Sequence, residues 1–296
     1  MKNITIIGSK QTGKKNNPVE LAEQIKSEKI NSRVIYWEDL LVKISNNDIE
    51  IILDGNNILD PKPDLVIALG WYKNGDKSIY RDLAFSLALL LKDKNIEFWN
   101  SEMGNQRSMT KLSCMMQLSL NSISVPTTYF SLDKKLLADK FEYPFIAKAA
   151  GASRGEMNYL IKNREDMAVV FESDAYFIVQ QYLENDHDLR VICFGGVPSL
   201  VLRRARKSDA DTHLNNTSQG ADASWIDLAD VSPELLTLSS KICIITGREM
   251  AGIDFIPDAV SNIGYSCLEV NAIPQITSGT DSDKKIAALV DAINNI

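Results

Sequence analysis

Side chains able to bind a metal ion gather near the C-terminal end of the sequence. Asp254 lies in the apolar segment 251–255, and Glu269 and Asn271 stand two residues apart in segment 268–274. Because residues two apart on a strand point to the same face, Glu269 and Asn271 are expected to project together, with Val270 in the core behind them. With Asp254 on a neighbouring strand they would offer two carboxylates and an amide oxygen, a set that suits a hard cation.

The plainer interpretation of these residues is a pair of surface acids on an exposed sheet face. The apolar residues that flank both segments argue against it, because an acid within an apolar strand needs a partner.

Basic side chains that could oppose these oxygens lie upstream. Lys148 ends the apolar segment 144–148, where a lysine can reach an anion but is more often a solvated strand end. Asp188 and Arg190 stand two apart and would share one face of a strand, and a guanidinium can bind phosphoryl oxygens through two parallel hydrogen bonds. Arg204 is a second candidate, although the strand register decides whether Arg204 or its neighbours Arg203 and Arg206 point inward.

The elements that must position these residues follow two patterns. In the first hundred residues short apolar segments alternate with helical spacing, which indicates a parallel α/β sheet; the expected strands are 4–8, 33–37, 49–53 as a candidate, 65–70 and 96–99, and the expected helices 18–28 and 78–92. The rest is α+β, with a hairpin across Gly195-Gly196; the expected strands are 145–148, 158–161, 176–183, 189–194, 197–203, 251–256 and 267–270, and the helices 109–120, 164–171, 233–246 and 283–293. Segment 209–224 is polar and is expected to be a mobile loop.

Composition narrows the function classes. The 296 residues carry a net charge of −7, which argues against nucleic acid as a partner. The four cysteines and two histidines are too scattered for a structural zinc site. The longest apolar stretch, 83–91, is too short to span a membrane, and the N-terminus lacks a signal peptide pattern. We therefore expect a cytoplasmic protein with no membrane partner.

In their order and spacing these residues resemble the ATP-grasp superfamily, and within it the branch of the glutamate ligase that modifies ribosomal protein S6 and of the glutathione synthetases. The resemblance covers about residues 97–296. Its most specific part is Asp254 followed by the Glu-x-Asn-x-x-Pro of 269–274. The Asp-x-Arg of 188–190, after Gln-Gln-Tyr-Leu at 180–183, is the next most specific.

The resemblance implies an ATP-grasp fold in which ATP lies between two α+β subdomains. The implied division is an N-terminal parallel-sheet pre-ATP-grasp domain over 1–99, a small subdomain with a glycine loop over 100–178, and a C-terminal subdomain with the metal site over 179–296. The implied ATP-binding residues are Lys111, Lys148, Ser153, Gly155, Gln181, Tyr182, Leu183, Asp188 and Asn216, with Leu183 and Ile146 on either side of adenine. Arg190 and Arg204 are the implied catalytic residues, and Asp254, Glu269 and Asn271 would bind magnesium, or manganese in its place.

Two positions depart from the family pattern. The glycine loop, which covers the phosphates in this family, reads Ser-Arg-Gly-Glu-Met over 153–157, without the usual second glycine. Gln275 stands at the substrate end of the site, where a glycine often follows the final proline.

The implied activity is a carboxylate–amine ligase that forms an amide or peptide bond through an acyl phosphate, with small-molecule or peptide substrates. Two alternatives remain. One is a kinase that binds ATP in the same way, and the other is a non-catalytic nucleotide-binding protein. The apolar helix expected over 78–92 is explained equally well by core packing and by a contact within a homo-oligomer.

A third alternative is a P-loop phosphotransferase, since Gly8 to Lys15 nearly fits the P-loop pattern. Its last position is Lys15, where a P-loop needs a hydroxyl for magnesium, so a basic turn is the better interpretation. Lys14→Ala should therefore change the Kd for ATP less than about twofold, because the phosphates are expected to bind elsewhere. Loss of binding in Lys14→Ala, with Glu269→Ala harmless, would instead favour the P-loop alternative; titration calorimetry with ATP and magnesium measures both.

Overall fold

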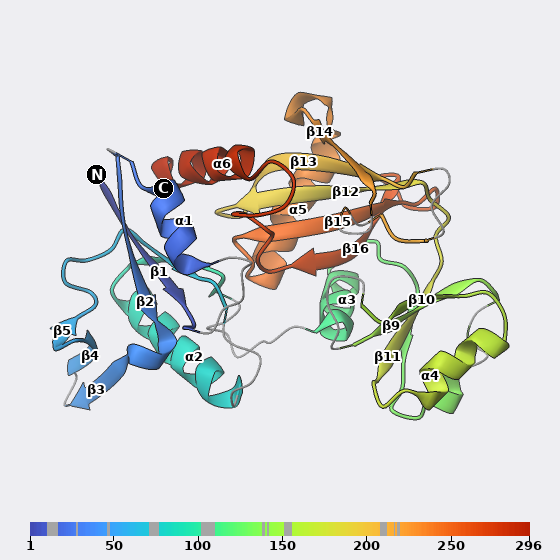
Figure 1. Cartoon of the computed structure of the whole chain (residues 1–296), viewed down its shortest axis with the longest axis horizontal. Coiled ribbons are helices and arrows are strands. Elements are labelled where there is room, and N and C mark those ends of the chain that lie inside the picture. The colour runs from blue at the N-terminus through green and yellow to red at the C-terminus, as the bar shows by residue number, and fades with distance from the viewer. Residues whose placement is uncertain are drawn as a thin grey trace.

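The computed structural model describes residues 1–10, 17–27, 29–45, 48–70, 77–101, 110–137, 140, 142–150, 156–207, 212–215, 217 and 220–296. The chain forms an N-terminal lobe, a large antiparallel sheet with its helices, and a small antiparallel sheet that lies to one side (Figure 1). No helix in the described part of the chain combines the length and apolarity needed to cross a bilayer.

The N-terminal lobe is built on a four-stranded parallel sheet in the order β2-β1-β6-β7. Its strands are β1 (Lys2–Gly8), β2 (Ile30–Tyr36), β6 (Leu65–Ala68) and β7 (Glu97–Trp99), and its helices are α1 (Pro18–Ile25) and α2 (Lys77–Asp93). Ile6 packs with α1 on one face, and the next residue, Ile7, packs with α2 on the other. Both faces are thus covered, as parallel sheets require, and the expected α/β class is confirmed.

The candidate strand at 49–53 does not join this sheet, so its placement from sequence was wrong. It is β4 (Asp48–Leu53), which pairs antiparallel with β3 (Leu41–Ser45) and β5 (Asn56–Asn57) in a separate three-stranded sheet. Only two residues separate β3 from β4, which is enough for a hairpin but far too few for the crossover between parallel strands.

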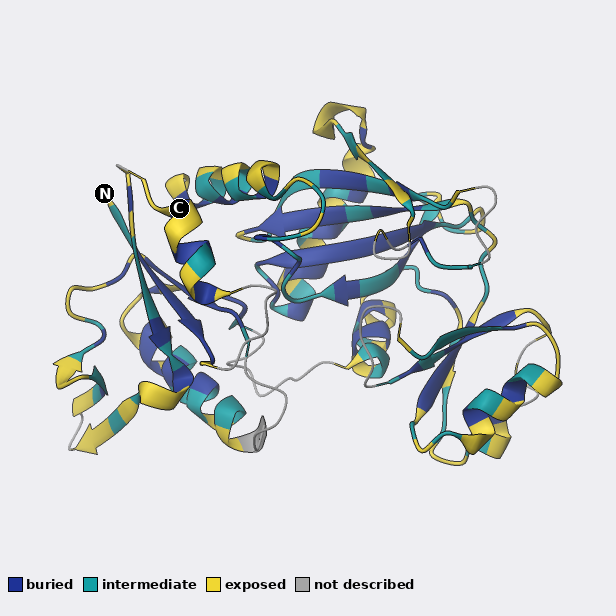
Figure 2. Ribbon diagram, viewed as in Figure 1, coloured by how far each residue is buried: buried dark blue, intermediate teal, exposed yellow. Residues whose placement is uncertain are grey.

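The large sheet is antiparallel, in the order β14-β13-β12-β15-β16. Its strands are β12 (His187–Phe194), β13 (Val197–Ala205), β14 (Asp222–Ile226), β15 (Ala251–Pro257) and β16 (Tyr265–Asn271). β14 lies at the end of the segment expected to be a loop. The central strands are dark with burial in Figure 2, because helices cover both faces.

Two helices cover one face of the large sheet, and a third covers the other. α3 (Lys111–Leu120) and α5 (Pro233–Thr246) pack on the face that contains Val191 and Ile253. α6 (Ser282–Asn294) packs on the opposite face with Ile192 and Phe194, in a cluster that also contains Ile4 and Ile6 of the N-terminal lobe. The last helix of the chain is therefore part of the core of the first lobe, beside α1 (Figure 1).

The small sheet has the order β10-β9-β11-β8, with all neighbours antiparallel. Its strands are β8 (Thr128–Phe130), β9 (Phe145–Ala149), β10 (Asn158–Ile161) and β11 (Phe177–Gln181). α4 (Ala168–Glu172) and short 3-10 turns cover one face, where Phe145 and Val179 are buried. Because side chains alternate along a strand, Lys148 projects from the other face.

Asn100 joins the N-terminal lobe to the large sheet. Its fully buried side chain donates to the carbonyl oxygen of Ala68 at 2.7 Å and accepts from the backbone N–H of Met250 at 3.3 Å. Its backbone has a φ of 67°, in the left-handed region that asparagine tolerates better than most residues. The next residue, Ser101, donates to the carboxylate of Glu249 through both its N–H and its hydroxyl.

Asn100→Ala should lower the free energy of unfolding by about 2 to 4 kcal/mol, because it leaves two buried backbone groups without partners and puts alanine in a left-handed conformation that asparagine tolerates better. Asn100→Gly is the matched control, since it removes the same hydrogen bonds but tolerates the backbone, and it should be about 1 kcal/mol more stable than Asn100→Ala. Urea denaturation followed by tryptophan fluorescence measures both. Variants as stable as the parent chain would mean that these bonds do not hold the lobes together.

Candidate functional site

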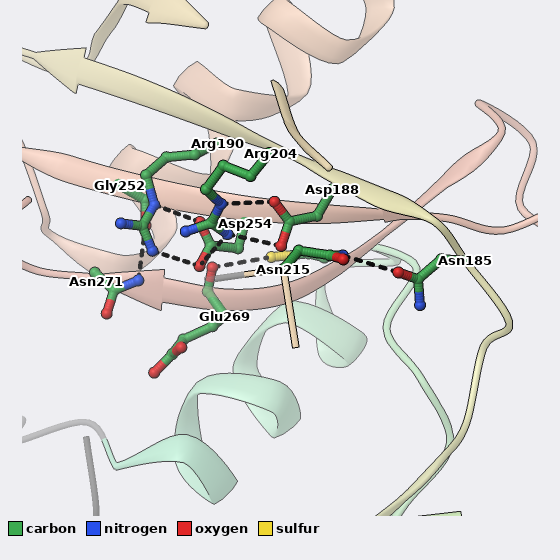
Figure 3. Close-up of polar contacts among 10 residues, drawn as sticks. Asn185, Asp188, Arg190, Arg204, Asn215, Gly252, Asp254, Glu269 and Asn271 are labelled. Carbon is green, nitrogen blue, oxygen red and sulfur yellow. Dashed lines mark hydrogen bonds and ion pairs between the residues drawn. The ribbon is translucent and has the colours of Figure 1, made fainter. Parts of the chain in front are cut away.

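One face of the large sheet changes from apolar to charged along its length. On β12, Phe194 and Ile192 pack against α6, whereas Arg190 and Asp188 continue the same face as charged residues. The register sets Asp188 opposite Arg204 of β13. These alternate positions form a row of charged side chains beyond the edge of the apolar core (Figure 3).

The neighbouring strands extend this row. Arg190 lies opposite Asp254 of β15, which in turn lies opposite Glu269 of β16. Gly252 and Asn271 form the next pair along β15 and β16. The expected proximity of Asp254 to Glu269 and Asn271 is therefore confirmed, and Val270 is buried in the core behind them.

The carboxylate of Asp254 pairs with two arginines. Arg190 donates from Nε and Nη2 to the two carboxylate oxygens, each at 2.7 Å. Nη2 of Arg204 lies 3.3 Å from Oδ2 of the same carboxylate. Burial alone would raise the pKa of Asp254, whose residue is only 4% exposed, but the two guanidinium groups hold it below its ordinary value. The carboxylate is thus kept ionised in a largely dry setting.

Gly252 lets Pro274 lie close to β15. A Cβ at Gly252 would lie 3.3 Å from Cβ of Pro274, closer than an ordinary contact, and 3.6 Å from Cδ of Arg190, which is an ordinary contact. Pro274 would have to shift by a few tenths of an ångström to admit that Cβ.

Arg204 is the arginine that points inward, which answers the question that the sequence left open. It is buried, and its Nε and Nη2 donate to the carboxylate oxygens of Asp188 at 2.6 and 2.7 Å, whereas Arg203 and Arg206 are half-buried. Burial lowers the pKa of Arg204, but the charges of Asp254 and Asp188 outweigh it and raise that pKa above its usual value. Burial also raises the pKa of Asp188, although Arg204 opposes the shift.

Glu269 and Asn271 complete the proposed ligand set for a metal ion. The amide of Asn271 donates to the carbonyl oxygen of Gly252 at 3.3 Å, so its Oδ1 remains an acceptor. In Figure 3 the carboxylate of Glu269 projects away from the two arginines, whereas the amide nitrogen of Asn271 points toward Gly252. Across the described residues no three His, Cys, Asp or Glu side chains cluster as metal ligands. The set here has two carboxylates and an amide oxygen, a donor chemistry that fits magnesium.

Lys148 of the small sheet faces these acids. It is half-buried, and burial lowers its pKa to about 8, with the charge of Lys111 adding to the shift and those of Glu269 and Asp254 opposing it. Lys148 therefore interacts electrostatically with Lys111 and with both acids, although the four residues lie on four separate elements. Cations that could bind an anion thus lie beside carboxylates that could bind a metal ion.

The expected adenine-binding residues lie at the end of β11 and in the segment that joins it to β12. Gln181 donates its N–H to the carbonyl oxygen of Thr127 at 2.9 Å, and the carbonyl of Leu183 accepts from Asn185 at 2.7 Å. Tyr182 and Leu183 are half-buried, whereas Ile146 is buried on the neighbouring β9. Ser153, Gly155 and Asn216 lie outside the described residues, as does Lys14.

A family model described as the RimK-like ATP-grasp domain matches residues 108–295. The chain belongs to the RimK-like ATP-grasp family. The matched span contains the five-stranded sheet with all of its charged row, together with the small sheet and Lys148.

Among relatives of this RimK-like chain, a Shewanella denitrificans protein named "Probable alpha-L-glutamate ligase 1" is 26% identical over 183 residues, which is 59% of this chain and 60% of that protein. A Halorhodospira halophila protein named "Probable alpha-L-glutamate ligase" is 24% identical over 202 residues, 64% of each chain. The matches thus span less than two thirds of these relatives.

Solved structures share the ATP-grasp fold across the whole chain. The ATP-grasp ligase PsnB, complexed with a phosphomimetic variant of its minimal precursor, Mg and ADP, aligns with a TM-score of 0.69 at 17% identity, covering 99% of this chain and 97% of PsnB. The D-alanine–D-alanine ligase of Bacillus anthracis complexed with ATP aligns with a TM-score of 0.60 at 14% identity, covering 100% and 97%. At these identities the likeness confirms the expected fold.

Lys285 is a buried cation beside the candidate site of this RimK-like domain that the sequence interpretation missed. Its ammonium donates to the carbonyl oxygens of Gln275 and Ser278 at 2.6 and 2.7 Å, which fixes the loop that follows β16. Burial, together with the charge of Arg190, lowers its pKa to about 8. Its spacing was a usable signal, because residues 285, 289 and 293 share one helical stripe and the other two are the buried Leu289 and Ile293.

Arg204→Met should lower the free energy of unfolding by about 3 to 5 kcal/mol, because it leaves the carboxylate of Asp188 buried without its bidentate partner. Arg203→Met is the matched control on the same strand, pointing to the other face, and should cost no more than about 0.5 kcal/mol. Urea denaturation measures both. Equal losses in the two variants would contradict the assignment of Arg204 as the buried partner of Asp188.

Proposed function

We propose that the protein is an ATP- and magnesium-dependent carboxylate–amine ligase that works through an acyl phosphate. The observation that carries the proposal is the charged row of the large sheet, where Asp254, Glu269 and Asn271 lie beside Arg190 and Arg204. Lys148 faces that row from the small sheet, as shown by its electrostatic interaction with Glu269 and Asp254. Membership of the RimK-like ATP-grasp family supports the same reaction class.

Lys148 and Lys111 would bind the phosphates of ATP, since Lys148 interacts with the acids of the row and Lys111 interacts with Lys148. Gln181, Tyr182 and Leu183 would hold the adenine, and Asp188 would lie near the ribose and phosphates. Ser153, Gly155 and Asn216 would complete the phosphate site.

Asp254, Glu269 and Asn271 would hold magnesium, which neutralises phosphate charge when bound. Manganese could take the same oxygen ligands. The PsnB complex with Mg and ADP supports this pairing of nucleotide and metal on the same fold.

In the first step an oxygen of the substrate carboxylate attacks the γ-phosphorus of ATP, the bond from that phosphorus to the β-phosphate oxygen breaks, and ADP leaves. Arg190 and Arg204 would stabilise the charge on the transferred phosphoryl group. Each arginine uses Nε and Nη2 to hold a carboxylate, and Nη1, which takes no part in those bonds, offers two further N–H donors.

In the second step an amine attacks the carbonyl carbon of the acyl phosphate, and inorganic phosphate leaves as the amide forms. The acyl phosphate must be shielded from water until the amine arrives. The small sheet, which carries Lys148 over the charged row, is the part of the chain suited to exclude water.

Glutamate is the proposed amine, supported by the names of the curated relatives. A peptide is the proposed carboxylate substrate, supported by the PsnB complexes with precursor peptides. A cytoplasmic location and a homo-oligomeric state stay predictions.

The deciding experiment is an ADP-release assay across pooled carboxylates and amines, with mass spectrometry of the products. A ligase releases ADP and phosphate only when both substrates are present, and its product gains the mass of the amine less water. A product that gains the mass of a phosphoryl group would point to a kinase. Nucleotide binding without turnover in every pool would point to a non-catalytic protein.

Glu269→Gln should lower kcat by about 100-fold or more, because it removes one of two carboxylates from the proposed metal site. Glu234→Gln, at an exposed glutamate on α5, is the matched control for loss of a carboxylate and should leave kcat within about twofold. Steady-state ADP release at saturating ATP measures both. Activity retained in Glu269→Gln across a range of magnesium concentrations would contradict the assigned metal site.

A further inference from the structure

Residues 212–215 bridge the large and small sheets. Nε2 of His213 lies 3.0 Å from Oδ1 of Asn158, which is on β10 of the small sheet. Asn158 pairs directly with Lys148 in the register of β9 and β10. His213 therefore reaches the small sheet beside the lysine that faces the charged row.

The same segment is also attached to the end of β13 and to the segment that joins β11 to β12. Nη1 of Arg206, just after β13, donates to the carbonyl oxygen of His213 at 2.6 Å. Asn215 is buried, and its amide donates to Oδ1 of Asn185 at 2.8 Å, in the segment that joins the two sheets. With both attachments in place, His213 is a contact between the two subdomains rather than part of a free loop.

The surroundings of His213 are cationic. Burial, together with the charges of Lys148, Arg206 and Lys162, lowers its pKa to about 4. These cations come from β9, from the residue after β13 and from the residue after β10, so they reach the ring from three elements. Among the described residues, every charged group that shifts this pKa is a cation.

Because Oδ1 of Asn158 is an acceptor, the neutral ring carries its proton on Nε2 and leaves Nδ1 as an acceptor. The cations that surround the neutral imidazole repel one another, and a bound anion would reduce that repulsion. An anion among them would cancel the repulsion that keeps the second proton off the ring.

We propose that His213 is a positioning residue that takes up a proton from solvent when the polyphosphate of the nucleotide binds among Lys148, Lys162 and Arg206. This inference rests on the proposed function, since it takes ATP as the ligand of that region. The proton goes to Nδ1, while Nε2 continues to donate to Asn158 and so keeps the two subdomains in contact. The ring then adds a fourth positive charge beside the phosphates only when they are present.

The test measures proton uptake on nucleotide binding. Magnesium and ADP are titrated into the whole chain at pH 6 by calorimetry, in two buffers of different ionisation enthalpy, for the parent chain and for His213→Gln. Glutamine can donate to Asn158 but cannot take up a proton. If bound nucleotide returns the His213 pKa from about 4 to its ordinary value of about 6.5, the parent should take up about 0.7 proton more than His213→Gln.

The sign of the pH effect follows from the same linkage. A ligand that raises the pKa of a group binds more tightly where that group is protonated, so lowering the pH favours binding. Between pH 8 and pH 6 the affinity of the parent should rise about fourfold relative to His213→Gln. Titration of the nucleotide itself occurs in both proteins and cancels in the comparison.

His187→Gln is the matched control, because His187 is the other histidine of the chain and pairs with Asp186 at the surface. It should keep the proton uptake of the parent. Equal uptake by the parent and His213→Gln would overturn this inference while leaving ATP binding, and with it the proposed function, in place. A parent chain that binds no nucleotide would overturn both.

A second measurement needs no change at residue 213. The imidazole resonances of the parent are followed against pH by NMR, with His187→Gln to assign them, and the pKa of His213 should rise from about 4 to about 6.5 when Mg and ADP are added. An unchanged pKa with nucleotide bound would overturn the proposal. Asn158→Leu, which removes the acceptor, should weaken nucleotide binding about 2- to 10-fold, and unchanged affinity would overturn the bridging role.

Discussion

The buried carboxylate of Asp254 is the group on which the arrangement of this site depends. A charge in a largely dry setting is costly unless it is paired and hydrogen-bonded. Arg190 meets that requirement with two bonds, and Arg204 adds a third contact while it holds Asp188 in turn. Four charges on three adjacent strands are thereby fixed relative to one another. A rigid set of this kind can meet charge that develops during phosphoryl transfer without reorganising, which is the main way that such sites lower a barrier.

The apolar part of the same sheet face keeps the charged row in position. Ile192 and Phe194 pack into the cluster shared by α6 and the N-terminal lobe, two residues along the strand from Arg190. On the other face α3 and α5 cover the strands. The charged row therefore lies at the margin of a core that is closed on both sides. Lys285 also fixes the chain beyond the strands. Its ammonium holds the loop that starts at Pro274, and Pro274 itself lies next to Gly252.

Local spacing predicted the parts of the site that depend on one strand. The alternation of side chains was enough to put Glu269 beside Asn271 and Asp188 beside Arg190. It could not choose Arg204 over Arg203, because that choice depends on the register between β12 and β13, which shifts between Ile192 and Cys193. The two-residue strand β5 and the polar strand β14 lack the apolar pattern by which strands are recognised, and both were missed. Lys285 was missed because lysine on a helix is ordinarily solvated, and only the neighbouring loop carbonyls make its burial tolerable.

The packing of α6 has a consequence for the order in which the molecule is made. Leu289 and Ile293 lie in the same apolar cluster as Ile4, Ile6 and Leu21, although about 280 residues separate them in the chain. During synthesis the first lobe emerges long before these two side chains, and the face of its sheet that α1 covers stays incompletely covered until residues 282–294 have left the ribosome. The N-terminal lobe is thus among the last parts of the chain to complete its interior, and the nascent chain must keep the apolar side chains that α6 will cover from aggregating until then.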